Sequence, residues 1–272
     1  MRNRKTRNFL CMLSCVLSCI LSCILAGLLF LVSAPAAALP LADIEGAIGG
    51  WQASPSGAMA LRGNDLDLEE ALDYEDETDF TARLKIGTPL VFPNIYLMAT
   101  PLKYEETATL SEGFTFGEKS FEEQTEFRSR LTLDHYDIGL YYNVPLVKTF
   151  SLHRLSLEAG LNARIIDAQA LVEQEAGGER VVARKSETLP VPMVYLGAGL
   201  YPVERFGLEM ELRGISYSDY DLLSVIGRLR VKAFGPMFLS GGYRHEAFGV
   251  KKDGLKIDVD FSGPFLEAGM KF

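Results

Sequence analysis

The sequence has 272 residues, a formal net charge of −9, and 48% hydrophobic residues. Its four cysteines all lie within the first 23 positions, so the chain beyond them has neither a disulfide scaffold nor thiol chemistry. It has only three histidines, no glycine-rich phosphate loop and no Gly-x-Ser-x-Gly elbow, which excludes the common nucleotide-binding and nucleophile signatures.

The N-terminal segment has the order of a secretory signal. Four basic residues in the first seven positions precede an apolar run from Phe9 to Val32 and a small-residue stretch at 33–38. We predict a signal peptide at 1–38, cleaved after Ala38, and a single barrel domain at 39–272. An uncleaved anchor helix is the main alternative, since about 20 apolar residues can span a bilayer. A lipoprotein signal is a third interpretation.

The rest of the chain alternates apolar with polar or glycine residues, which is the period of strands with two different faces. In Leu155–Ile165 the odd positions are apolar and the even ones are polar or glycine. The same alternation recurs at 80–87, 206–213 and 223–232. No later segment is long and apolar enough for a membrane helix.

Two architectures fit this alternation. In a soluble sandwich the apolar face forms the core, whereas in a membrane barrel it meets lipid and the charges line the lumen. An even number of strands and alternating short and long connections favour the barrel. We predict an all-β fold, a single antiparallel transmembrane barrel of ten strands, at 43–51, 79–87, 94–104, 127–142, 152–167, 189–201, 206–217, 222–234, 237–248 and 256–272.

Two predicted strands change phase. Leu131 and Leu133 are odd while Ile138 and Leu140 are even, and a similar change occurs within 257–266. Each break indicates a bulge, or a strand that has left the bilayer.

The last strand ends on Phe272, with Leu266, Ala268 and Met270 on the same face. This resembles the β-signal read by the barrel assembly machinery, although Glu267 stands where that signal has glycine. The resemblance implies that this machinery is a partner during biogenesis.

Three short motifs resemble an uncharacterised family of proteobacterial outer-membrane β-barrel proteins. They are the segment 51–57 (WQASPSG), the turn 89–94 (PLVFPN), and Asp137 followed by Tyr141-Tyr142. The resemblance implies a barrel in the cell outer membrane, in contact with its lipid and lipopolysaccharide, and implies no activity.

Two enzyme classes remain as alternatives. Asp134-His135 and Asp219-Tyr220-Asp221 invite comparison with omptin-type proteases, but adjacent residues on a strand point to opposite faces. A lipid A deacylase would need a serine beside a histidine, and His245 with Ser240 or Ser262 is the available set. We predict that the chain is not an enzyme, with no catalytic, cofactor-binding or metal-binding residues and no cofactor.

Acidic residues are concentrated in two segments. The segment 65–79 carries nine carboxylates. The segment 105–126 contains seven glutamates and one lysine, Lys119, and therefore carries a net charge of −6. Because no net-basic surface is expected to be exposed, we predict no nucleic-acid binding. Divalent cations could bridge these segments to lipopolysaccharide phosphates, which we keep as a hypothesis.

Parity also predicts which charges face the lumen. A lumen of about ten strands lies near the size that side chains fill. We therefore predict a structural or interaction protein with a largely closed lumen, in which acids pair with bases. The predicted acids are Glu158, Glu209, Glu211, Glu246 and Glu267, and the predicted bases are Arg164, Arg213, Arg228, Arg230, Lys232, Arg244 and Lys271.

Overall fold

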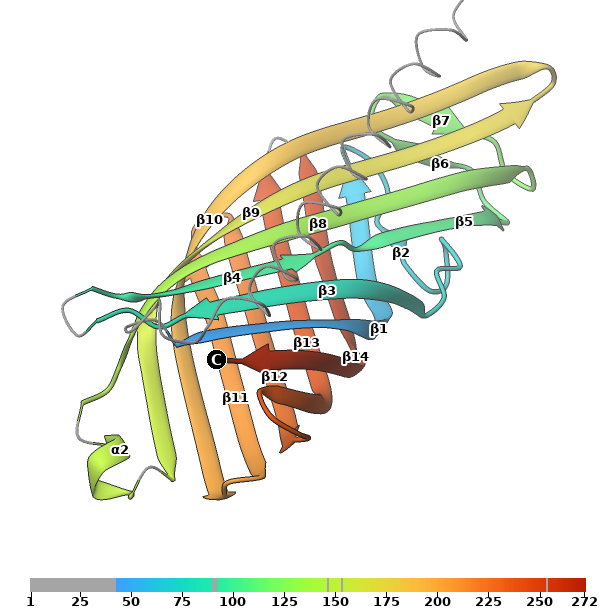
Figure 1. The fold of residues 1–272 in the computed structure, drawn as a ribbon. Helices are drawn as coiled ribbons and strands as arrows, with labels where there is room; N and C mark the ends of the chain where they lie inside the picture. Colours follow the sequence, from blue (N-terminus) through green and yellow to red (C-terminus); the bar gives the residue numbers. More distant parts are fainter. Residues whose placement is uncertain (1–42, 90–91, 146, 153, 253) are drawn as a thin grey trace, which may run out of the picture. The chain divides into compact units, whose positions relative to one another are not determined.

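In the computed structural model, which describes residues 43–272 except 90, 91, 146, 153 and 253, ten strand positions close into an antiparallel ring. The ring runs β1, β3, β4, β8, β9, β10, β11, β12, β13, β14, and the last strand pairs with the first (Figure 1). Every ring strand therefore has two neighbours, which leaves the membrane level without an open sheet edge.

The ring strands match the predicted ones in number and order. Their bounds are β1 Ile44–Leu61, β3 Glu77–Ile86, β4 Asn94–Thr100, β8 Glu126–Asn143, β9 Leu155–Ala176, β10 Glu179–Val203, β11 Phe206–Tyr217, β12 Tyr220–Lys232, β13 Met237–Lys252 and β14 Leu255–Lys271. The predicted all-β barrel is confirmed.

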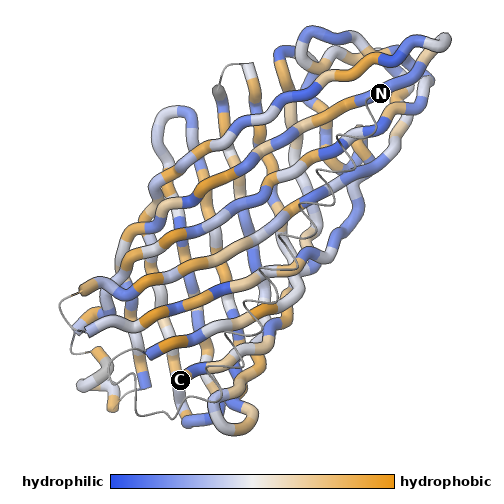
Figure 2. Tube along the Cα trace, turned by 45° about the horizontal axis from the view of Figure 1, so that its top comes forward, coloured by the Kyte–Doolittle hydropathy of each residue, from blue (hydrophilic) through white to orange (hydrophobic). Residues whose placement is uncertain are grey.

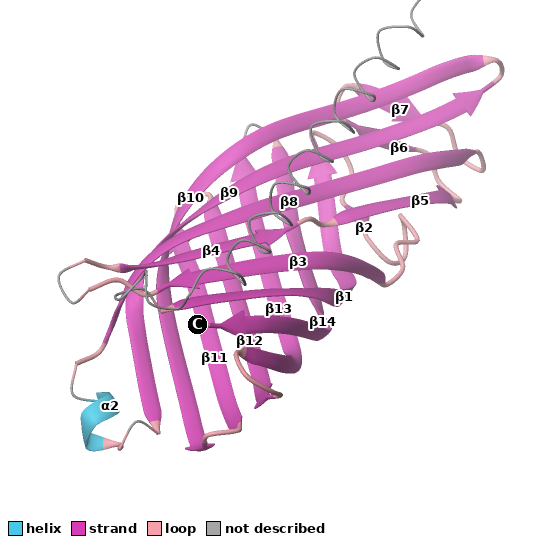
Figure 3. Cartoon of the chain, viewed as in Figure 1, coloured by secondary structure: helices cyan, strands magenta, loops and turns pink. Residues whose placement is uncertain are grey.

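Shorter elements complete the described chain. The predicted strand 94–104 is interrupted at Pro101, and its continuation β5 (Lys103–Thr109) also pairs with β8. Strand β2 (Leu66–Asp67) adds to β1, while β6 (Phe114–Phe116) and β7 (Lys119–Phe121) form a separate hairpin. One helical turn, α2 (Val147–Phe150), lies between β8 and β9 (Figure 3). None of the helices in the described part of the chain has the length and apolar character to cross a membrane.

The two ends of the barrel differ. At the terminal end, where β1 begins and β14 ends, the turns connect β3 to β4, β8 to β9, β10 to β11 and β12 to β13. At the opposite end, called the loop end, strands β1, β9 and β10 extend well past the predicted limits. Two regions expected to be loops, 53–78 and 168–188, are therefore partly strand, which corrects those predictions. Asp43–Phe272 form one compact unit, and the predicted signal peptide lies outside the described residues.

The exterior of the terminal half is apolar. Side chains such as Leu161 (69% exposed) and Leu266 (67%) point away from the interior, and the neighbouring positions on each strand are buried inside. The resulting alternation is visible along the strands in Figure 2. An apolar exterior around a polar interior is the polarity of outer-membrane barrels, and it contradicts the soluble-sandwich alternative. We call this exterior band the apolar belt.

At the loop end the polarity inverts. On β8 the exterior changes from Tyr136 in the belt to Asp134 above it, while the interior changes from His135 to Leu133. Strands β8 and β9 keep one register from Phe127 to Asn143, and β13 and β14 keep theirs throughout. The bulge interpretation of the two phase breaks is therefore wrong. These strands leave the hydrocarbon layer, and their apolar side chains turn from lipid to an internal core.

That internal core fills the loop half of the barrel. Aromatic rings from the barrel wall and the extra hairpin stack there: Phe114 lies 4.8 Å from Phe121 and 4.9 Å from Phe127 between ring centroids. Tyr104 stacks on Phe261 at 5.3 Å and donates a hydrogen bond to the carbonyl of Ala53. Loop and wall residues thus form one hydrophobic core inside the loop half, called the plug. Its buried members include Trp51, Met59, Leu68, Leu72, Tyr74, Phe116, Leu131, Val172, Val191, Phe248, Ile257 and Val259.

We predict that arginine is tolerated above the apolar belt and rejected within it. Leu161→Arg, at an exterior belt position, is expected to destabilise the barrel by about 2 to 4 kcal/mol because the charge faces hydrocarbon. Leu171→Arg, on the exterior of β9 above the belt, is the control and should cost less than about 1 kcal/mol. Denaturant unfolding from lipid vesicles, followed by Trp51 fluorescence, measures both. Equal losses of stability in the two variants would show that the hydrocarbon layer does not end between these two positions.

Candidate functional site

The terminal half of the lumen is a buried ionic network. Its charged side chains come from eight ring strands and from both sides of the barrel, and most are under 10% exposed. The network contains the acids Glu45, Asp137, Glu158, Glu209, Glu211, Glu246 and Glu267 and the bases Arg83, Lys85, Arg164, Arg213, Arg228, Arg230 and Arg244.

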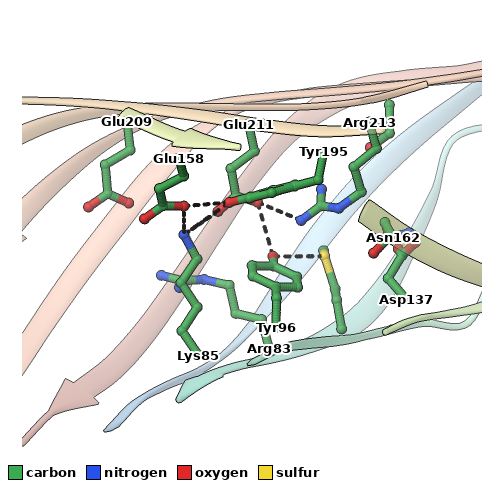
Figure 4. A network of polar contacts seen from close by, with 12 residues as sticks. Arg83, Lys85, Tyr96, Asp137, Glu158, Asn162, Tyr195, Glu209, Glu211 and Arg213 are labelled. Carbon is green, nitrogen blue, oxygen red and sulfur yellow. Dashed lines mark hydrogen bonds and ion pairs between the residues drawn. The ribbon is translucent and has the colours of Figure 1, made fainter. Parts of the chain in front are cut away.

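Glu211 on β11 is the most highly connected carboxylate. It accepts hydrogen bonds from Arg213 (2.9 Å), Arg228 (2.8 Å) and the Tyr96 hydroxyl (3.0 Å), and its Oε1 lies 3.2 Å from Lys85 Nζ. Lys85 is on β3, which stands opposite β11 in the ring. Figure 4 shows the two walls meeting at this carboxylate. The ion pair therefore spans the lumen at this level.

A second group lies at the terminal end. Arg83 donates to Glu45 (2.7 Å) and forms a forked contact with Glu267, whose nearest oxygen is 2.8 Å away. Arg230 on β12 reaches Glu45 on β1 at 2.8 Å and also donates to Glu209 at 3.1 Å. At least two cations contact each of these acids, so strands are linked through side chains as well as through backbone.

A third group lies directly beneath the hydrophobic plug. Arg164 on β9 holds Asp137 (2.9 Å) and crosses to Glu246 on β13 (2.6 Å), with both ion pairs fully buried. Arg244 donates to Glu246 and to Thr100, and its Nη2 lies 3.1 Å from His135 Nε2. The ionic network and the plug therefore meet without an intervening solvent layer at His135, which packs edge-on against Phe248.

Aromatic faces compensate guanidinium groups that have few acceptors. Arg213 has one hydrogen bond to Glu211, while its Nε and Nη1 have no hydrogen-bond partner within the described residues. Its guanidinium carbon lies 4.5 Å above the Tyr96 ring and 5.1 Å from the Tyr195 ring. Such cation–π contacts are worth about 2 kcal/mol when desolvated. The rings thereby take the place of missing acceptors and occupy the space between the walls.

The predicted lumen residues are mostly in place. All five predicted acids and the five predicted arginines belong to the network. Lys232 is exposed at the terminal rim, which corrects its assignment, whereas Lys271 is half exposed there and contacts both Asp43 (3.1 Å) and the network acid Glu45 (3.8 Å). Both lie at strand ends, where parity no longer fixes burial. Sequence reasoning missed Glu45, Arg83, Lys85 and Asp137, although each has the parity of an interior position.

The residues of the omptin comparison are not brought together as a dyad. Asp134 points to the exterior and accepts a hydrogen bond from the Leu102 amide (3.1 Å). His135 is buried inside, with Nδ1 3.0 Å from the Leu133 carbonyl. Asp221 is exposed at the loop end. The adjacent Asp134 and His135 occupy opposite faces, as strand geometry requires.

The residues of the deacylase comparison do not form a hydrogen-bonded serine–histidine pair either. Ser240 is 2% exposed inside the barrel, whereas His245 faces outward, with Nε2 3.9 Å from Asp260 Oδ1. Ser262 is opposite His245 in register and accepts a hydrogen bond from Tyr243 at 3.2 Å. Ser240 thus lies on the opposite face from His245, whereas Ser262 shares the exterior face with His245 and has its hydrogen bond with Tyr243.

The acidic segments at the loop end are tied into the structure. Asp67 accepts the amides of Glu69 and Glu70, both at 2.9 Å, and Lys256 reaches Asp65 at 2.7 Å. Among residues 43–272, outside the gaps named above, no group of three or more His, Cys, Asp or Glu is placed to hold a metal ion. The divalent-cation hypothesis therefore has no preformed site to support it.

No family model matches the chain, and no curated protein matches it. Three solved structures illustrate its similarities. The attachment invasion locus protein Ail of Yersinia pestis, in complex with the heparin analogue sucrose octasulfate, is 10% identical over 85% of this chain and 99% of that one, with a TM-score of 0.32. Neisserial surface protein A is 14% identical, with coverages of 85% and 97% and a TM-score of 0.28. The Pseudomonas putida toluene transporter TodX is 11% identical, with coverages of 89% and 92% and a TM-score of 0.29. These scores are low, and the barrel's own strand order and polarity carry the assignment of its fold.

We predict that removing Glu211 is far more costly than removing a surface acid. Glu211→Ala leaves three buried cations with one acceptor fewer and should destabilise the barrel by about 3 to 5 kcal/mol. Glu173→Ala, which breaks an exposed pair with Arg180 (2.6 Å), is the control and should cost less than about 1 kcal/mol. Unfolding in denaturant reports both values. Similar values for the two variants would show that the network is solvated.

Proposed function

We propose that the protein is an integral outer-membrane barrel with a structural or interaction role, acting through its outward surfaces rather than through a pore. The observation that carries this proposal is that side chains from opposite walls meet across the interior in the terminal half and pack together in the loop half. The ion pair between Lys85 and Glu211 joins opposite walls in the terminal half, and the aromatic plug fills the loop half.

The interior contains an ionic network in one half and an apolar plug in the other, and this combination supports a permanently closed lumen. An ionic network alone could admit water and ions, since charged groups tolerate hydration. The plug above it is apolar, and its members Trp51, Phe116 and Phe261 are fully buried. An ion crossing the barrel would have to disrupt paired charges and then pass through a hydrocarbon-like layer, where an unpaired charge is costly.

The extension at the loop end supports an interaction role. Strands β8, β9 and β10 continue beyond the belt with polar exteriors, and Gly177 and Gly178 close the β9–β10 hairpin with positive φ values of 59° and 83°. This is the backbone of a tight two-residue hairpin turn. Polar strands projecting from the membrane offer a rigid surface to other molecules. Membership of an uncharacterised outer-membrane family, the lipopolysaccharide contact and the use of the barrel assembly machinery remain part of this proposal.

The hydrolase alternative gains no hydrogen-bonded catalytic pair among the described residues. Asp134 and His135 lie on opposite faces, as do Ser240 and His245, and Ser262, which shares the exterior face with His245, accepts its hydrogen bond from Tyr243. The proposal therefore assigns no catalytic residue.

Planar bilayer recording tests the closed lumen. We expect the inserted wild-type barrel to give no large, steady conductance, because paired charges and aromatic rings occupy the passage. Electrophoresis of the same sample with and without boiling verifies insertion of folded protein, since a folded barrel migrates differently before boiling. Steady, unselective conductance from folded protein would make a porin the better assignment.

A further inference from the structure

The outer wall of the loop end carries a basic patch on four adjacent strands. Beyond the belt, β5, β8, β9 and β10 lie side by side in that order (Figure 1). Register places Glu105, Arg130, Leu171 and Arg184 in one lateral row. Basic residues are unexpected here, because the two acidic segments give the rest of the loop end a negative charge.

Three cations converge on one carboxylate at the centre of this patch. Glu105 pairs with Lys103 (3.1 Å), with Arg130 (2.5 Å) and with Arg128. The carboxylate is 20% exposed, while the Lys103 and Arg128 side chains are each 54% exposed. The cations are thus drawn together by an acid that neutralises one of them, and a net charge of two remains open to solvent.

The neighbours of this trio extend the patch. Arg184 is exposed and donates to Gln169 at 3.1 Å. The next row toward the belt places Lys103 beside Thr132, Gln169 and Ser186, which offer neutral hydrogen-bond donors. Glu173 borders the trio on the other side, where its hydrogen bond from Arg180 lowers the pKa of the carboxyl. Glu173 also lies opposite Arg128 in register. Counting Arg180 and Arg184, the patch has five cations beside the carboxylates of Glu105, Glu173 and Glu175, so an excess of positive charge remains.

The height of the patch identifies the kind of ligand. Arg130 is six residues beyond Tyr136, the last exposed aromatic of the belt on β8, which is about 20 Å along a strand and about 15 Å along the membrane normal at a tilt of about 40°. A phospholipid headgroup layer is only about 5 to 8 Å thick. The patch therefore stands above ordinary lipid phosphates, at the level of a sugar chain attached to a lipid.

We propose that Lys103, Arg128 and Arg130, with Arg184, bind the phosphate groups of a glycolipid whose sugar chain is phosphorylated. Arginine and lysine are the side chains that bind phosphate most effectively, and here they meet such groups from the side as the glycolipid stands against the barrel wall. This inference rests on the proposed outer-membrane placement and names the partner of its outward surface.

The test measures glycolipid retention by the full-length mature barrel in detergent, using native mass spectrometry. The probe is a rough lipopolysaccharide with a phosphorylated inner core, compared with the same preparation after chemical dephosphorylation and with phosphatidylglycerol. We expect retention of the phosphorylated form alone. Competition by inorganic pyrophosphate at millimolar concentration distinguishes a free phosphate from a glycolipid, and we expect it to leave the bound glycolipid in place.

Two variants with opposite effects sharpen the test. The triple variant Lys103→Gln, Arg128→Gln, Arg130→Gln should weaken binding by about 30-fold or more, while Glu105→Gln, which frees the trio from its internal acid, should strengthen it. The control replaces three loop-end cations outside the patch by glutamine: the exposed Arg62 and Lys251 and the half-exposed Lys256. It makes the same change in net charge and should bind as the wild type does.

Boiled and unboiled gel migration establishes that every variant is folded. Equal losses in the triple and control variants would show that net charge alone attracts the lipid, and would overturn the proposal. Equal retention of phosphorylated and dephosphorylated probes, or complete displacement by pyrophosphate, would overturn it as well. A folded, non-conducting barrel that fails to bind would leave the proposed closed barrel intact, so the two failures are distinguishable.

Discussion

The structure depends on one constraint: each long strand passes from hydrocarbon into water without a break in its hydrogen-bonded register. The outward-facing side chains of a strand must therefore be apolar where the strand crosses hydrocarbon and polar where it lies in water. Between Tyr136 and Asp134 the exterior of β8 makes this change, and between His135 and Leu133 the interior makes the opposite one. The chain thus stacks a membrane barrel beneath a water-facing barrel built from the same strands.

The ionic network is the consequence of that constraint in the membrane half. Because the apolar side chains of each strand face lipid, the alternating polar side chains face the interior. Ten strands enclose too narrow a space for free hydration of so many charges. Burying an ion pair is nearly neutral or costly in free energy, but leaving one partner unpaired costs more. Matching of acids with bases across the lumen, as at Arg164 and Glu246, therefore favours one arrangement of the walls.

The water-facing half follows the opposite logic and defines where the molecule can act. Its apolar interior side chains pack in the plug, so the polar groups available to other molecules are on its exterior. There Lys103, Arg128 and Arg130 hold an excess of positive charge on a protein that is otherwise acidic. Surface ion pairs contribute little to stability, and the clustering of three cations about Glu105 is easier to explain as ligand recognition than as structural support.

The sequence alone determined the strand class, the ring size and the face of most side chains, because alternation is a local property of extended backbone; the strand at 206–217 has the predicted bounds. It did not determine that the regions near 53–61 and 168–188 are strand, since their alternation is reversed in polarity, although Gly177-Gly178 is a hairpin signal. Only the tertiary structure decided which charges meet. Lys85 and Glu211 are distant in the sequence, and ring closure places them on facing walls, where burial makes their pairing obligatory.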